Sequence, residues 1–93
     1  MAKEKDNLTG LFWFGRVATT AGKQLDRGEQ ALRRVLASSA LGVDGNPAPV
    51  AVNFRLGELL AKKGDKAGAR QAYEAALRLN PNLEQVKKAL REL

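Results

Sequence analysis

The sequence predicts an all-α protein of about five helices, folded as two antiparallel hairpins and a last short helix. Ala and Leu dominate its apolar residues, and both are strong helix formers. Within several stretches the apolar residues recur at steps of three and four, which is the spacing of one helical face. Glycine and proline residues separate these stretches and end one helix before the next. Together these features favour a helical protein over a β-rich one.

The first helix is predicted from about Thr9 to Ala21. Gly22 follows it, which fits the left-handed residue often found just beyond a helix. Asp6, Asn7 or Thr9 is expected to cap its start. The residues of its expected core stripe lie along one face: Leu11, Phe14, Val17, Ala18 and Ala21.

The second helix is predicted to follow Asp26. Asp26 and Glu29 have the spacing of a capping box, with Asp in the place of Ser or Thr. The helix should fade over residues 38–40, and the turn formers of residues 41–47 then predict a loop. The expected apolar face of the helix holds Ala31, Leu32, Val35, Leu36 and Ser39.

The third helix is predicted to begin at Asn46 or Ala48, with Pro47 in its first turn, and to end at Gly64. Its expected apolar face holds Val50, Val52, Leu56, Leu59 and Leu60.

Asp65 is expected to cap the fourth helix, which stops before Pro81. The expected face of this helix holds Ala69, Ala72, Tyr73, Ala76 and Leu77. Asn82, with Gln85 at the capping-box position, is expected to cap a last helix. The apolar residues of this last segment are Leu83, Val86, Ala89, Leu90 and Leu93.

Residues 50–83 resemble the tetratricopeptide repeat (TPR) family, whose helical hairpin repeats every 34 residues. Leu56-Gly57 stand at the Leu-Gly pair of that signature, and Leu60 stands at its Tyr. The pattern continues in register with Gly64-Asp65, Ala69, Tyr73, Ala76 and Pro81. Asn53 departs from it, because the family usually has Trp or another large apolar residue there, and Phe54 is expected to compensate.

Residues 9–43 resemble a degenerate copy of the same repeat. Phe14-Gly15 align with Leu56-Gly57, Ala18 with Leu60 and Gly22 with Gly64. With one extra residue in the turn, Gly28, Leu32 and Val35 stand for Ala69, Tyr73 and Ala76. An unrelated helical pair that packs on one repeat is the alternative for this half.

The resemblance implies two TPR hairpins stacked in a right-handed superhelical array, with a polar C-terminal capping helix. Residues 1–8 are expected to form a flexible charged N-terminus and residues 9–93 the TPR-like domain. Within that domain the expected division is a degenerate repeat (9–40), a loop (41–47), a TPR (48–83) and a capping helix (84–93).

The resemblance also implies a function, because partners of TPR proteins usually lie in the concave groove formed by the first helix of each repeat. The corresponding residues here are Phe12, Arg16 and Thr19 in the first unit and Phe54, Glu58 and Lys62 in the second. The two Phe residues are expected to anchor a protein or peptide and the charged residues to select it; the alternative is that either Phe belongs to the core. A subset of the family binds chaperone C-termini through Lys, Asn and Arg of three successive repeats. This chain offers two repeats, so that mode is not expected.

Leu11–Phe14 is a run of four large apolar residues. Neighbours on a helix are about 100° apart, so all four cannot face one core. Leu11 and Phe14 fit the core stripe, which leaves Phe12 or Trp13 exposed as an aromatic patch. Such a patch predicts a partner, a preceding repeat or a homodimer, and self-association is therefore one alternative to an adaptor or scaffold role.

The net charge of +6 raises a second alternative, a basic nucleic-acid-binding domain. The basic residues are spread over both halves of the chain, however, and no recognition motif accompanies them. The basic groups of this alternative are Lys62, Lys63, Lys66, Arg70, Lys87, Lys88 and Arg91. Salt-dependent binding of oligonucleotides would distinguish it.

Cysteine and histidine are both absent from the chain. A disulfide framework and a zinc site built on thiolate or imidazole are therefore excluded, and so are the commonest nucleophile and base of enzymes. The sequence predicts no enzyme, no metal site and no cofactor. No apolar run is long enough to cross a bilayer or to form the core of a signal peptide, so no compartment is identified.

Overall fold

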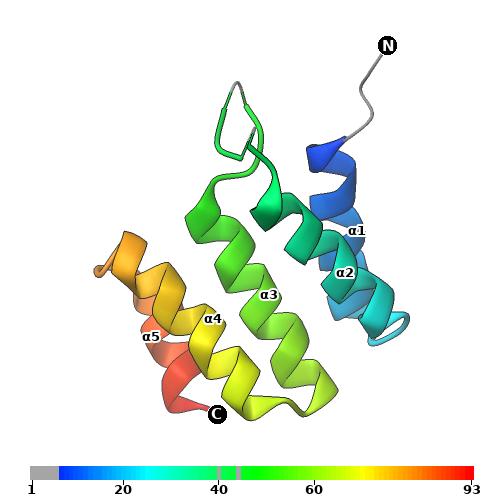
Figure 1. The fold of residues 1–93 in the computed structure, drawn as a ribbon. Helices are drawn as coiled ribbons and strands as arrows, with labels where there is room; N and C mark the ends of the chain where they lie inside the picture. The colour runs from blue at the N-terminus through cyan, green and yellow to red at the C-terminus, as the bar shows by residue number, and fades with distance from the viewer. Residues whose placement is uncertain (1–6, 40, 44) are drawn as a thin grey trace.

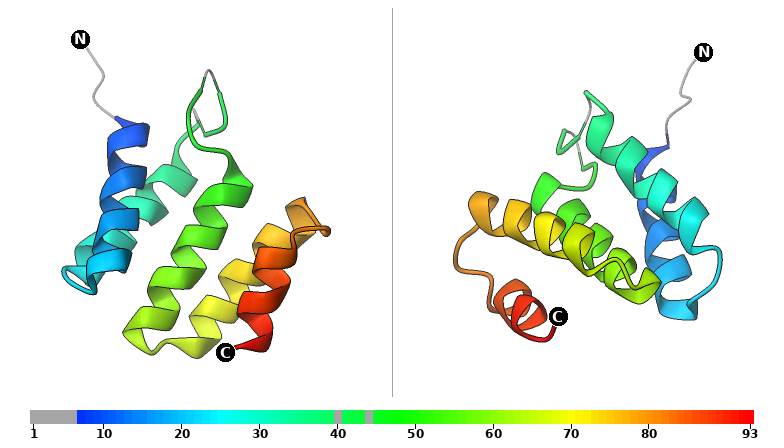
Figure 2. Two further views of the ribbon diagram at one scale, coloured as in Figure 1. Left: turned by 180° about the vertical axis from the view of Figure 1, so that it is seen from behind. Right: turned by 60° about the horizontal axis from the view of Figure 1, so that its bottom comes forward.

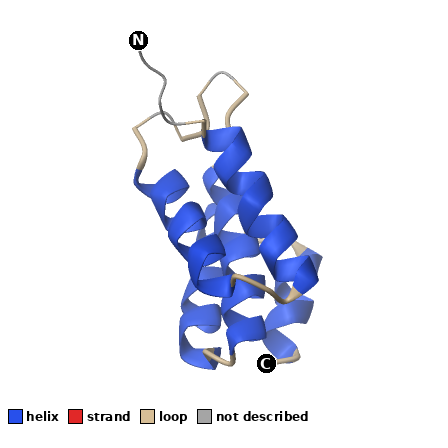
Figure 3. Ribbon diagram, turned by 90° about the vertical axis from the view of Figure 1, so that its right-hand side faces the viewer, coloured by secondary structure: helices blue, strands red, loops and turns tan. Residues whose placement is uncertain are grey.

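The computed structural model of the chain describes residues 7–39, 41–43 and 45–93. Within these ranges it is all-α, as predicted, and the side view coloured by secondary structure contains helices and loops (Figure 3). Its elements are α1 (Leu8–Ala21), α2 (Leu25–Ala37), α3 (Pro49–Lys63), α4 (Lys66–Leu79) and α5 (Glu84–Arg91). The predicted cap at Asp6 and most of the predicted flexible N-terminus lie outside the described residues.

The helices form two hairpins and a fifth helix (Figure 1). α1 packs against α2, and α3 packs against α4. α3 also contacts both helices of the first hairpin, and α5 packs on α4. Seen from behind, α1, α3 and α5 form one layer, with α2 and α4 beneath it (Figure 2). The first helices of the two hairpins therefore lie on the same side of the molecule.

The core runs through all five helices. Its fully buried members include Leu32 and Val35 of α2, Leu59 of α3 and Val86 of α5. Leu83, Ala89, Leu90 and Leu93 are partly buried and pack against this cluster, as predicted for the last segment. Leu8, where α1 begins one residue earlier than expected, is also buried.

Two glycines allow the two helices of each hairpin to approach closely. A Cβ atom on Gly57 would lie 2.5 Å from the Tyr73 ring, and a Cβ atom on Gly15 would lie 2.5 Å from Leu32 Cγ. Gly15 corresponds to Gly57 and Leu32 to Tyr73 in the predicted alignment. The first hairpin therefore has the same glycine-to-large-side-chain contact as the second.

Several predicted helix ends are confirmed. Gly22 and Gly64 have left-handed backbones, with φ of 68° and 90°, at the ends of α1 and α3. Among the capping candidates of α1, Asn7 accepts a hydrogen bond from the Gly10 amide. Asp65 caps α4 by accepting one from the Gly68 amide, at 2.9 Å. Pro49, not Pro47, occupies the first turn of α3.

The predicted capping roles of Asp26 and Asn82 are wrong. α2 begins at Leu25, after Gln24 in a left-handed conformation, so Asp26 lies inside its first turn. α5 begins at Glu84, and the Asn82 amide donates a hydrogen bond to Asn80 Oδ1 instead. Ser39 lies beyond the end of α2, which is Ala37.

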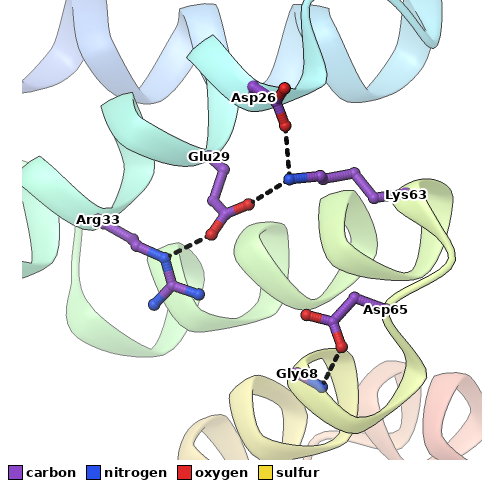
Figure 4. A network of polar contacts seen from close by, with 6 residues as sticks. All are labelled: Asp26, Glu29, Arg33, Lys63, Asp65 and Gly68. Carbon is purple, nitrogen blue, oxygen red and sulfur yellow. Dashed lines mark hydrogen bonds and ion pairs between the residues drawn. The ribbon is translucent and has the colours of Figure 1, made fainter.

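Asp26 and Glu29 join the two hairpins (Figure 4). Lys63 Nζ of α3 lies 2.6 Å from Asp26 Oδ1 and 2.7 Å from Glu29 Oε1 of α2. Arg33 Nε lies 2.7 Å from the second oxygen of Glu29. These hydrogen bonds raise the pKa of Lys63, and bonds from Lys63 and Arg33 hold the pKa of Glu29 below its usual value. The residues read as a local capping box thus contact a helix from the other hairpin.

The core stripe predicted for α1 is partly wrong. Leu11 and Ala18 face the core, but Phe14 and Val17 are 37% and 59% exposed, and Ala21 is exposed as well. The helix instead turns Leu8, Leu11, Gly15 and Ala18 inward. The apolar pattern does form a helix, but it continues around a second face that no described residue covers.

Candidate functional site

Two neighbouring depressions lie on the surface of the layer that contains α1 and α3. The first, of about 560 Å³, is polar and is formed by Arg16, Thr19, Arg55, Glu58, Lys62 and Tyr73, among others. The second, of about 470 Å³, is more apolar and includes Phe12, Ala51, Phe54 and Leu83. Both include Arg16 and Arg55, so they adjoin. We call the two together the α1–α3 groove.

The six residues expected in the concave groove all line these depressions. Arg16, Thr19, Glu58 and Lys62 lie at its polar end, and Phe12 and Phe54 lie at its apolar end. Sequence reasoning missed further lining residues, among them Arg55 and Tyr73. Arg55 follows Phe54 in the chain, and its guanidinium carbon lies 5.1 Å from the centre of that ring, which brings it to the groove.

The polar end carries an excess of positive charge. Three basic residues, Arg16, Arg55 and Lys62, line it together with one acidic residue, Glu58. Arg55 pairs with Glu58 at 2.9 Å. Arg16 lies 4.6 Å above the Trp13 ring, and neither Arg16 nor Lys62 forms an ion pair with another described residue. Two cations thus remain available to an anionic ligand.

Tyr73 forms the wall between the groove and the core. Its side chain is buried, and its ring lies 6.0 Å from the Phe54 ring at an interplanar angle of 43°. Burial, helped by the charges of Glu58 and Glu92, raises the pKa of Tyr73 to about 12. The hydroxyl is protonated at neutral pH, as in any tyrosine near its usual pKa, and can donate a hydrogen bond to a ligand.

Thr19 in the groove and Asn53 elsewhere on α3 each bond to a carbonyl of their own helix. Thr19 Oγ1 donates to the Gly15 carbonyl at 2.8 Å, and Asn53 Nδ2 donates to the Pro49 carbonyl at 3.0 Å. The Thr19 hydroxyl keeps its acceptor lone pairs, but its proton is already engaged. Thr19 therefore adds less to anion recognition than the cations beside it.

The aromatic run at the start of α1 divides between two sides of the helix. Phe12 is partly buried, packs against the core and lines the groove. Trp13 is 51% exposed and lies outside the apolar end of the groove, next to the exposed Phe14. The exposed aromatic neighbours are therefore Trp13 and Phe14, and the predicted patch of Phe12 and Trp13 is wrong for Phe12.

Within the described residues, no group of three or more acidic side chains gathers as a metal site would require. None of the described helices is long and apolar enough to cross a membrane.

The family comparison gives a match over the second hairpin. Residues 50–83 match the model of the tetratricopeptide repeat, and this segment coincides with the α3–α4 hairpin. The match confirms the family resemblance of that hairpin, while the degenerate repeat of the first half remains a prediction. Searches of curated proteins and of solved structures found no match.

Proposed function

We propose that the chain is an adaptor or scaffold module that binds a protein partner in the α1–α3 groove. A tetratricopeptide repeat is in general a protein–protein interaction module, and stacked repeats form concave binding surfaces. The observation that carries the proposal is the adjacency of the two depressions. An apolar anchor site and a cationic site share Arg16 and Arg55, so one continuous peptide can occupy both.

The chemistry of the groove defines the segment that it would accept. Phe12 and Phe54 suit an aromatic or branched aliphatic side chain, because burial of apolar surface is the main driving force of such contacts. Arg16 and Lys62 suit a carboxylate a few residues away, since neither forms an ion pair with a described residue. The Tyr73 hydroxyl adds a neutral donor to the same end. The expected ligand is an extended peptide with an apolar anchor and a nearby acidic residue.

The proposal is tested by selecting displayed random peptides against the immobilised full chain. The enriched peptides should combine an aromatic or aliphatic residue with Asp or Glu, and their affinities are then measured by fluorescence anisotropy. Arg16→Glu and Lys62→Glu should each weaken binding about tenfold or more, because a cation that faces the ligand becomes an anion. Phe54→Ala should weaken it as well.

Arg70→Glu is the matched control, because Arg70 is exposed on α4, lines neither depression, and its change also lowers the net charge by two. Its affinity should equal that of the wild type. Phe54 packs against Tyr73, so circular dichroism must show that Phe54→Ala is folded. Selected peptides that bind Arg16→Glu and Lys62→Glu as tightly as the wild type would refute the groove as the binding site.

A further inference from the structure

α1 carries a second apolar stripe that faces away from the molecule. Its members are Gly10, Phe14, Val17 and Ala21, all exposed, with Trp13 and Thr20 beside them. Their spacing of four, three and four residues is the a/d spacing of a helix–helix seam. We call Gly10, Phe14, Val17 and Ala21 the outer seam.

In the second hairpin, the first hairpin covers the equivalent surface of α3. Counting 42 residues on from Gly15 to Gly57, the same positions of α3 are Val52, Leu56, Leu59 and Lys63. The three apolar ones are 0–3% exposed. α3 packs on α1 and α2, with Leu59 next to Gly28 and Lys63 on Asp26 and Glu29. The outer seam of α1 is thus the equivalent packing surface at the open end of the fold, where no described helix follows (Figure 2).

Charge decides which kind of helix fits the outer seam. A helix like α2 brings two carboxylates to a lysine, but Ala21 stands at the position of that lysine. Carboxylates there would lose water without gaining a cation. The whole of α1 has one charged residue, Arg16, which lies over Trp13 and away from the seam. The matching surface is an uncharged apolar helix, and α1 of a second copy is such a helix.

We propose that two copies of the chain pair through their outer seams, α1 against α1 in antiparallel orientation about a two-fold axis. In this arrangement Phe14 packs against Val17 of the second copy, and Gly10 against Ala21. The small residues at both ends permit a short distance between the helix axes. A depression of about 250 Å³, lined by Trp13, Arg16, Val17, Thr20 and Ala21, lies on the flank of α1 between the outer seam and the groove.

The dimer leaves the α1–α3 groove open. On a helix with about 100° per residue, the outer seam lies roughly 160° around α1 from Phe12, Arg16 and Thr19. The two binding surfaces therefore lie on nearly opposite sides of the helix. Each dimer would present two grooves, and failure of the pairing would leave the proposed peptide binding intact.

Sedimentation equilibrium of the full chain tests the pairing directly. One short helix pair is a small interface, so the mass should rise from 10.1 kDa toward twice that value between about 1 µM and 1 mM. Trp13, the only tryptophan, flanks the seam and should shift its emission to shorter wavelength over the same range. A wild type that stays monomeric throughout this range would overturn the proposal.

Val17→Glu should keep the chain monomeric at every concentration, because it places a charge in the seam. Val17 is 59% exposed in the single chain, so the helical circular dichroism should not change. Gln71→Glu, with the same added charge on α4, should dimerise like the wild type. Persistent dimers of Val17→Glu would show that another surface pairs, and would overturn the assignment.

A mixing experiment tests the antiparallel register. Phe14→Lys and Val17→Glu should each be monomeric alone, but an equal mixture should form a heterodimer. In that heterodimer the ammonium introduced in one chain would face the carboxylate introduced in the other, while the unchanged Val17 and Phe14 pair at the second contact. A parallel pair would instead place each introduced charge opposite an unchanged apolar residue. Absence of a heterodimer in the mixture would overturn the antiparallel arrangement.

Discussion

At the scale of single residues, Gly57 is the position that most strongly sets the packing of the second hairpin. A Cβ atom there would lie 2.5 Å from two carbon atoms of the Tyr73 ring, which is shorter than a van der Waals contact. Tyr73 is buried and packs against Phe54, so the ring has little room to move. The absence of a side chain at Gly57 is therefore a packing requirement.

Gly57→Ala should destabilise the chain by about 1–3 kcal/mol, because overpacking outweighs the gain in helix propensity. The measurement is the free energy of unfolding in urea. Ala in place of a helical Gly normally stabilises a protein by up to about 1 kcal/mol. The sign of the change in the free energy of unfolding therefore distinguishes overpacking from the gain in helix propensity. Gly15→Ala, with Leu32 in the place of Tyr73, should behave in the same way. Stabilisation by either change would contradict the packing argument.

These glycines were recognisable in the sequence, while the exposed side of α1 was not. Gly57 and Tyr73 belong to a motif with fixed spacing, so their contact could be predicted. Phe14 and Val17 were placed in the core because they continue an apolar pattern. Periodicity shows that a helix has an apolar face, but only the presence of a neighbouring helix decides whether that face is covered. For Phe14 no described neighbour exists.

At the scale of helices, α2 and α3 are joined by a polar network as well as by apolar packing. The spacing of Asp26 and Glu29 predicts a local capping box, which α2 does not form. Both carboxylates instead pair with Lys63, which lies 34 residues after Glu29 in the chain. A contact so distant in the sequence has no local signal, which is why sequence reasoning assigned the same residues a different role. The residues expected in the groove do line one surface, because their positions follow from the register of α1 and α3.

Glu29→Gln should weaken the joint between the hairpins. Glu29 accepts hydrogen bonds from both Lys63 and Arg33, and its side chain is 21% exposed. Loss of such a partly exposed charge network should reduce the free energy of unfolding by about 1 kcal/mol at pH 7. Glu74→Gln is the control, because Glu74 is exposed on α4 and pairs with no described residue.

The same network predicts a dependence on pH. The pKa of Glu29 is lowered by folding, so its contribution is complete above its usual value of 4.5. It is lost as the pH falls below 4.5 and through the lower pKa of the folded state. The difference in urea stability between wild type and Glu29→Gln should therefore shrink toward zero on acidification. A difference that stays constant down to about pH 2 would contradict this role.

At the scale of the whole molecule, the two ends of the helical stack differ. α5 closes one end, since Val86 is buried and the other apolar residues of this segment pack on the core. The other end presents the outer seam of α1. Between them, the two hairpins meet along α3, which contacts both α1 and α2. We therefore expect the hairpins to unfold together, because each covers apolar surface of the other.

Each hairpin contains one intrinsic probe of this coupling, Trp13 in the first and Tyr73 in the second, and the chain has no other Trp or Tyr. Urea unfolding followed by Trp13 fluorescence and by Tyr73 absorbance should give one shared midpoint. Leu59→Ala should lower both midpoints equally, at a cost of about 2–5 kcal/mol, because Leu59 is fully buried against Gly28 at the joint. Val43→Ala, in an exposed loop, should leave both unchanged. Two separate midpoints in the wild type would mean that each hairpin is a folding unit of its own.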